Sequence, residues 1–127
     1  MDSEIVRGSQ CKGFRGEDGI VRMIYETNAQ LVLEDARNNV ELVNKLTGNK
    51  KRPLLVDARH SKSVDKAARA YLASEGAKNL SAFAILVESP LSRMIGNFFI
   101  GLDKGPIPTR LFTSETEALR WLGEFLQ

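Results

Sequence analysis

The sequence predicts an α/β fold built on a mixed β-sheet, and three observations carry this prediction. The turn Glu17-Asp18-Gly19 lies between two alternating apolar segments, which is typical of a β-hairpin. After the hairpin, strand-like apolar runs alternate with segments of helical spacing. The run Leu80 to Val87 is nearly continuous in apolar residues, as in a central strand buried on both faces. We therefore expect a single domain over residues 1–127, with an N-terminal hairpin, a partly parallel sheet and about four α-helices.

The first half of the chain is predicted to contain the hairpin, one helix and one buried strand. The hairpin strands cover residues 10–16 and 19–26. Apolar residues at steps of three and four predict a helix over Leu33 to Thr47, and Gly48 is a suitable stop. A strand over Leu54 to Asp57 follows.

The second half is predicted to alternate helices and strands. A helix is expected over Val64 to Ser74, and another from Pro90 to Leu102. A short strand over Thr109 to Phe112 precedes a closing helix, for which Ser114 and Glu117 match a capping box. The predicted core face of the first helix is Val64, Ala67, Ala68, Tyr71 and Leu72. That of the second is Leu91, Met94, Ile95, Phe98, Phe99 and Leu102, with Ile100 outside it.

Composition and charge narrow the classes of function. The chain has 43% hydrophobic and 27% charged residues, which is ordinary for a globular protein. A net charge of +2 is too small to indicate nucleic-acid binding. The basic cluster at Lys45, Lys50, Lys51 and Arg52 has no aromatic residues nearby for base stacking, so we interpret it as a solvated turn. With no signal-peptide core and no apolar run of roughly 20 residues, we expect a cytoplasmic protein without a transmembrane segment.

The single cysteine and the single histidine limit the chemistry further. Cys11 alone cannot form an internal disulfide or a multi-cysteine zinc site, and one cysteine fits a reducing compartment. No motif surrounds it, so we expect a strand residue rather than a nucleophile. His60 lies in a polar loop and is expected to face solvent.

The segment from Pro53 to Ala73, PLLVDARHSKSVDKAARAYLA, contains the expected functional site. A buried strand runs directly into Asp57, a polar loop follows over Ala58 to Ser63, and an alanine-rich helix comes next. In α/β sheets, sites for ligands and partners lie at the carboxyl ends of strands, where such loops begin. The sequence therefore places function at this junction.

The same segment, together with the order of elements, resembles the STAS domain, the fold of SpoIIAA-type anti-sigma-factor antagonists and of sulfate-transporter tails. The stretch SPLSRMIGNFFIGLDKGPIPTRLFTSETEALRWL is similar to a subgroup of uncharacterised bacterial STAS-like proteins. The resemblance implies a SpoIIAA-like fold and a regulatory role through protein binding. In the antagonists a serine at the start of the helix is phosphorylated. At the matching positions this chain has Lys66, Ala67 and Ala68, so the usual phosphoacceptor is missing.

Two acidic residues are expected to organise the loop. Asp57 is expected to accept hydrogen bonds from backbone N–H groups, and Asp65 falls where the family has its later acidic residue. An Asp57-His60-Ser61 hydrolase is the enzymatic alternative, but the serine lacks a nucleophile elbow. A metal site formed by Asp57, His60 and Asp65 matches no known spacing. Ser63 is expected to cap the helix, with phosphorylation of Ser61 or Ser63 as an alternative role.

The leading hypothesis is a non-enzymatic module, without a cofactor, that binds another protein through this loop and helix. Positive charge on the surface favours an acidic partner. The alternative is a carrier of a lipid or other small ligand, with an apolar pocket beside the helix from Leu91 to Leu102. The expected partner-binding residues are Arg59, His60, Ser61, Lys62, Ser63, Lys66 and Arg69. The expected pocket or homodimer face is Met94, Phe98, Phe99 and Ile100.

Overall fold

The computed structural model describes residues 4–102 and 107–126, with the backbone alone for residues 98–102. In this part of the chain, six strands form one mixed sheet in the order β1-β2-β3-β5-β7-β8. The predicted α/β class with a mixed sheet is confirmed. The strands are β1 (Val6–Gly8), β2 (Cys11–Arg15), β3 (Val21–Tyr25), β5 (Arg52–Asp57), β7 (Leu80–Leu86) and β8 (Thr109–Phe112).

The helices follow the predicted order. They are α1 (Leu33–Thr47), α2 (Lys66–Ser74), α3 (Pro90–Leu102) and α4 (Glu115–Leu122). The 3-10 turns η1 (Glu75–Ala77) and η2 (Gly123–Phe125) extend α2 and α4. None of the helices in the described ranges is long and apolar enough to cross a membrane.

The predicted hairpin is present as the antiparallel pair of β2 and β3. Gly19 has φ of +87° in the connecting turn, a left-handed conformation that glycine adopts without strain. A third strand, β1, pairs with the outer side of β2 and was not predicted. Its three residues are too few to produce a readable apolar alternation.

The remaining strands are parallel, from β3 through β5 and β7 to β8. The predicted central strand is confirmed, since β7 lies between β5 and β8 and is largely buried. A parallel pair requires a crossover, and the helical segments between these strands provide it. The carboxyl ends of β5, β7 and β8 consequently meet at one edge of the sheet.

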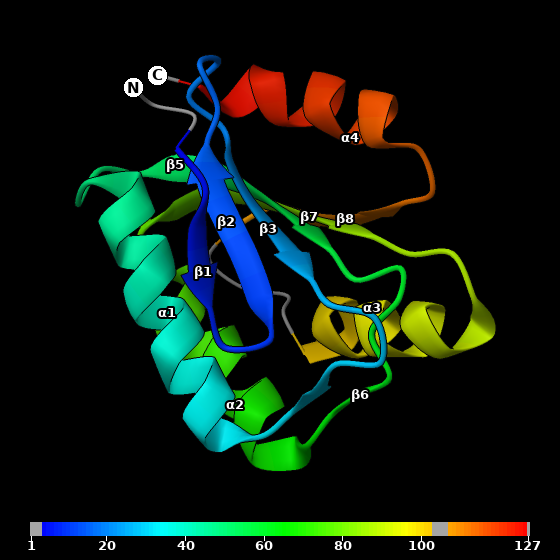
Figure 1. The fold of residues 1–127 in the computed structure, drawn as a ribbon. Helices are drawn as coiled ribbons and strands as arrows, with labels where there is room; N and C mark the ends of the chain where they lie inside the picture. Colours follow the sequence, from blue (N-terminus) through cyan, green and yellow to red (C-terminus); the bar gives the residue numbers. More distant parts are fainter. Residues whose placement is uncertain (1–3, 103–106, 127) are drawn as a thin grey trace.

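The helices cover the two faces of the sheet unequally (Figure 1). Helices α1, α2 and α3 lie on one face, and α4 lies on the other. On the face of α4 the core contains Leu55, Ala84, Leu86 and Leu122. On the opposite face it forms two adjoining clusters, one beside α1 and one beside α2 and α3.

Helix α1 has the predicted bounds, and Gly48 follows it with φ of +65°, as expected for a left-handed stop. The predicted buried face of helix α3 is right at Ile95 and wrong at Leu91 and Met94, which are exposed, while Ser92 is buried in addition. The side chains of residues 98–102 lie outside the described part of the chain. The helix approaches β8 at Gly96, where an added Cβ would lie 2.5 Å from a methyl group of Leu111. Close packing at this glycine decides which face of the helix is covered.

Candidate functional site

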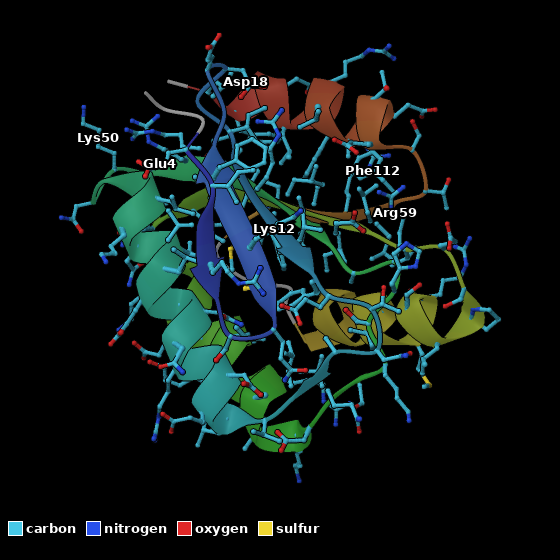
Figure 2. The ribbon with its side chains drawn as sticks, in the orientation of Figure 1. Glu4, Lys12, Asp18, Lys50, Arg59 and Phe112 are labelled. Atoms are coloured by element: carbon cyan, nitrogen blue, oxygen red, sulfur yellow. The ribbon has the colours of Figure 1, made fainter. Side chains whose placement is uncertain are left out.

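The candidate site is the edge of the sheet where the parallel strands end. The register aligns Asp57 of β5, Leu86 of β7 and Phe112 of β8 as neighbours. The loop from Ala58 to Asp65 begins at this edge and leads into α2. In Figure 2, Arg59 lies at the same end of the sheet as Phe112, and Lys50 lies at the opposite end of β5.

Asp57 and Arg59 form the first contact of the loop. Oδ1 of Asp57 accepts hydrogen bonds from the backbone N–H of Arg59 (3.1 Å) and from its Nε (2.9 Å), and Oδ2 accepts one from Nη2 (2.7 Å). Burial acts to raise the pKa of Asp57, but the hydrogen bonds from Arg59 outweigh it, so the pKa lies below its ordinary value. Asp57 is therefore ionised at neutral pH, so it cannot act as a general acid, and its lowered pKa and its hydrogen bonds to Arg59 make it a weak general base.

The rest of the loop is held by backbone hydrogen bonds to the segment that precedes α1. The N–H of Asn28 donates to the carbonyl of His60 (2.8 Å), and the N–H of Lys62 donates to the carbonyl of Ala29 (2.8 Å). Two short strands, β4 (Gln30–Leu31) and β6 (Ser63–Val64), then pair in parallel. These contacts fix the backbone of the loop against residues 28–31.

Helix α2 begins two residues later than predicted, at Lys66. Asp65 is its N-cap and accepts a hydrogen bond from the N–H of Ala68 (2.8 Å). The prediction that Ser63 caps the helix is wrong, because Ser63 belongs to β6. The predicted buried face is wrong at Ala67, which is exposed, and right at Ala68. Pairing of β6 with β4 delays the start of the helix, since Ser63 and Val64 are extended.

The predicted partner-binding residues differ in exposure. His60, Lys62, Ser63 and Lys66 are exposed. Arg59 and Arg69 are half-buried, and the charge of Arg59 is paired with Asp57. Ser61 is only 5% exposed, so its predicted role as a surface contact is wrong. The turn in which the N–H of Ser61 donates to the carbonyl of Ala58 directs this residue inward.

The geometry does not assemble the enzymatic alternatives. Asp57 is engaged with Arg59, His60 lies 4.0 Å from Glu88, and Ser61 is buried. Among the described residues, no group of three His, Cys, Asp or Glu side chains is arranged to hold a metal ion. Cys11 is buried in β2, and burial raises the pKa of its thiol to about 12. At neutral pH it is a protonated thiol, and the thiolate is the reactive form.

An apolar cavity lies between the sheet and α1, α2 and α3. It borders α3 as the sequence predicts, through Ile95 in the described part of that helix, but α1 and α2 also line it. Met94, a predicted pocket residue, is 63% exposed and does not line the cavity. The side chains of Phe98, Phe99 and Ile100 lie outside the described residues. Sequence reasoning missed the lining residues of α1 and α2, for which the small residues around Ala73 were the available signal.

A search of solved structures agrees with the fold. The chain is similar to an uncharacterised protein of the DUF3478 family with a SpoIIAA-like fold from Shewanella loihica PV-4. The two share 19% sequence identity over 96% of this chain and 98% of that one, with a TM-score of 0.65. This likeness concerns the fold alone. The chain therefore has a SpoIIAA-like fold, the fold of STAS-type domains, as the sequence resemblance implied.

The family itself is shown by sequence. Residues 14–126 match the model of DUF7793, a domain of unknown function, and the chain belongs to this family. It is also similar to a protein of unknown function from Arthrobacter sp. FB24, with 38% identity over 87% of this chain and 96% of that one and a TM-score of 0.35. No curated protein matches.

Proposed function

We propose that this domain is a non-enzymatic regulatory module of STAS type that binds another protein through the loop after β5 and the start of α2. The main support is the exposure of Lys62 and Lys66 on a backbone that hydrogen bonds hold against residues 28–31 and at the N-cap of α2. A surface that is ordered before binding loses little conformational entropy when the partner docks. Such a surface suits recognition better than catalysis, for which it lacks an assembled set of groups among the described residues.

The charge of this surface favours an acidic partner. Lys62 and Lys66 carry exposed positive charge, whereas Arg59 is neutralised locally by Asp57. Exposed charges of this kind raise association rates and lose strength in salt. The partner is therefore expected to bind more weakly as ionic strength rises.

Regulation by phosphate at the helix start is not expected for this chain. The first residues of α2 are Lys66, Ala67 and Ala68, and none of them can accept a phosphate as a serine does. Ser63 is exposed and Ser61 is buried. Any phosphoacceptor in this loop is therefore Ser63, beside the cationic side chain of Lys62.

The test compares two charge-reversed variants in affinity purification from native cell extract. Lys62→Glu/Lys66→Glu changes the proposed surface, and Lys50→Glu/Lys51→Glu makes the same change in charge at the opposite end of β5. A protein retained by the wild type and the control, and lost with the first variant, supports the proposal. The affinity of that protein, once identified and purified, should fall as salt is raised.

Two results would contradict this proposal. A partner lost equally with both variants would indicate a nonspecific effect of net charge. A partner retained by both would place the interface elsewhere on the molecule.

A further inference from the structure

The cavity on the face of α1, α2 and α3 has a volume of about 80 Å³. A single water needs roughly 10–15 Å³ on this measure, so the space accommodates several non-hydrogen atoms. Small residues at the end of α2 and in η1, Ala73, Gly76 and Ala77, leave room opposite the sheet residues Val56 and Ile85. The cavity therefore lies between core elements and reaches the loop after β5 at Ala58 and Ser61.

The cavity wall is apolar and uncharged. No Asp, Glu, Lys, Arg or His belongs to the described lining. A carboxylate, phosphate or ammonium group would therefore enter without a charged partner, at a large desolvation cost. The wall selects for a neutral occupant.

The hydroxyl group of Ser61 is the one polar side-chain group of the described cavity wall without a hydrogen-bond partner. Its Oγ is buried and has no hydrogen-bond partner among the described residues. The other polar side chains of the described lining are engaged, since Asn39 donates to the carbonyl of Ser9 (3.0 Å), Thr109 donates to that of Ile107 (3.4 Å), and Tyr25 is hydrogen-bonded with Asn39. Buried hydroxyl groups are normally hydrogen-bonded, so an unpaired one inside a cavity points to an occupant.

We propose that the cavity binds a small neutral molecule with an apolar body and one hydroxyl or carbonyl group, and that Ser61 Oγ is the hydrogen-bond partner of that group. The aliphatic walls contact the body of the molecule, and Ser61 fixes its polar end at the loop after β5. The loop then has two sides, because Ser61 faces the cavity while its neighbours His60 and Lys62 face solvent. The inference does not depend on the proposed protein partner.

The test is an NMR titration of the full chain, followed through its backbone amide signals. The probes are 1-hexanol and hexanoate at pH 8, which share a chain length and differ in charge. We expect 1-hexanol to cause saturable shifts at Ser61, Leu72 and Ile95. Hexanoate should bind at least about tenfold more weakly, because its charge is not paired in the cavity.

Two variants separate the parts of the proposal. Ser61→Ala should weaken the binding of 1-hexanol by about fivefold, the effect of one hydrogen bond. It should leave the binding of benzene, which has no hydroxyl group, unchanged. Ala73→Leu should fill the cavity and abolish the binding of both 1-hexanol and benzene. Retained amide dispersion in each variant shows that it is folded.

Several results would overturn the inference. Absence of saturable shifts with 1-hexanol and benzene would mean that the cavity is filled by water or by side-chain movement. Equal affinity for 1-hexanol and hexanoate would contradict a neutral site. Unchanged binding of 1-hexanol to Ser61→Ala would remove Ser61 from the site. None of these outcomes alters the expected result of the lysine-reversal experiment, so the two proposals fail separately.

Discussion

The two faces of the sheet differ in how helices cover them: α4 covers one face, and α1, α2 and α3 cover the other (Figure 1). On the face of α4, Ala82, Ala84, Ala118 and Leu122 are fully buried. The rings of Phe112, Trp121 and Phe125 pack in sequence beside them, with centroids 5.7 and 4.9 Å apart. On the other face, three helices meet over a cavity. One helix with small residues beneath it covers its face of the sheet with fully buried side chains, whereas the face with three helices encloses a cavity.

This difference indicates where the protein tolerates change. Protein interiors are close-packed, so space for a ligand is an exception that lowers stability where it occurs. The face of α4 is therefore expected to supply more stability per residue. The face with the cavity lies next to the loop after β5, and so the weaker face and the candidate site coincide.

The largest expected effect comes from truncating a leucine on each face. Leu122→Ala removes a fully buried side chain from the face of α4. It should lower the free energy of unfolding by about 3–5 kcal/mol. Leu72→Ala, at the half-buried wall of the cavity, should cost only about 1–2 kcal/mol, because this side chain already has space beside it. Urea denaturation measures both, and a cost at Leu72 equal to that at Leu122 would remove the distinction between the faces.

The second-largest effect comes from the opposite substitution, alanine to leucine, on each face. Ala84→Leu on the face of α4 adds a larger side chain at a fully buried position of the core cluster and should cost about 1–3 kcal/mol. Ala73→Leu at the cavity should raise stability by about 0.5–2 kcal/mol, because it fills a void. Thermal unfolding of the two variants gives opposite signs if the faces differ as described. A loss of stability in both variants would show that the cavity does not accept a side chain.

The smallest effect concerns the loop that closes the weaker face. Asp57→Asn removes the carboxylate that accepts three hydrogen bonds from Arg59, but keeps one oxygen acceptor, and should cost only about 0.5–1 kcal/mol at pH 7. Because the pKa of Asp57 is lowered in the folded protein, its stabilising contribution is present above the ordinary Asp pKa of 3.8. The contribution is lost as the pH falls through the folded value. The difference between wild type and variant should therefore shrink below about pH 4.

Amide hydrogen exchange shows which part of the protein Asp57→Asn destabilises. In Asp57→Asn, amides of residues 58–65 should exchange faster at pH 7 while those of α4 keep their protection. Equal acceleration throughout both regions would show that Asp57 supports the whole sheet, and would argue against a separately organised loop.

Local sequence patterns predicted much of the fold. The turn around Gly19 and the alternation beside it predicted the hairpin, and the helical spacing before Gly48 predicted α1 with its observed bounds. The apolar run beginning at Leu80 predicted the central strand. These features could be predicted because their signals depend on periodicity and on residues that stop or turn the backbone.

Other features depend on contacts between distant segments. β4 and β6 have two residues each, too few for a pattern, and they exist because they pair with one another. Their pairing sets the start of α2 and makes Asp65 rather than Ser63 the N-cap. Leu91 and Met94 of α3 were mispredicted as buried because the helix is apolar on more than one side, and the approach of Gly96 to Leu111 selects among them.

The sequence by itself determined the class of fold, the order of the helices and of the longer strands, and the edge of the sheet where the candidate site lies. Tertiary structure alone decided that Ser61 turns inward while His60 and Lys62 remain outside. It also decided that α1, α2 and α3 leave a cavity beside this serine. The physical reason is that local periodicity reports on one element at a time, whereas burial and empty space arise only where several elements meet.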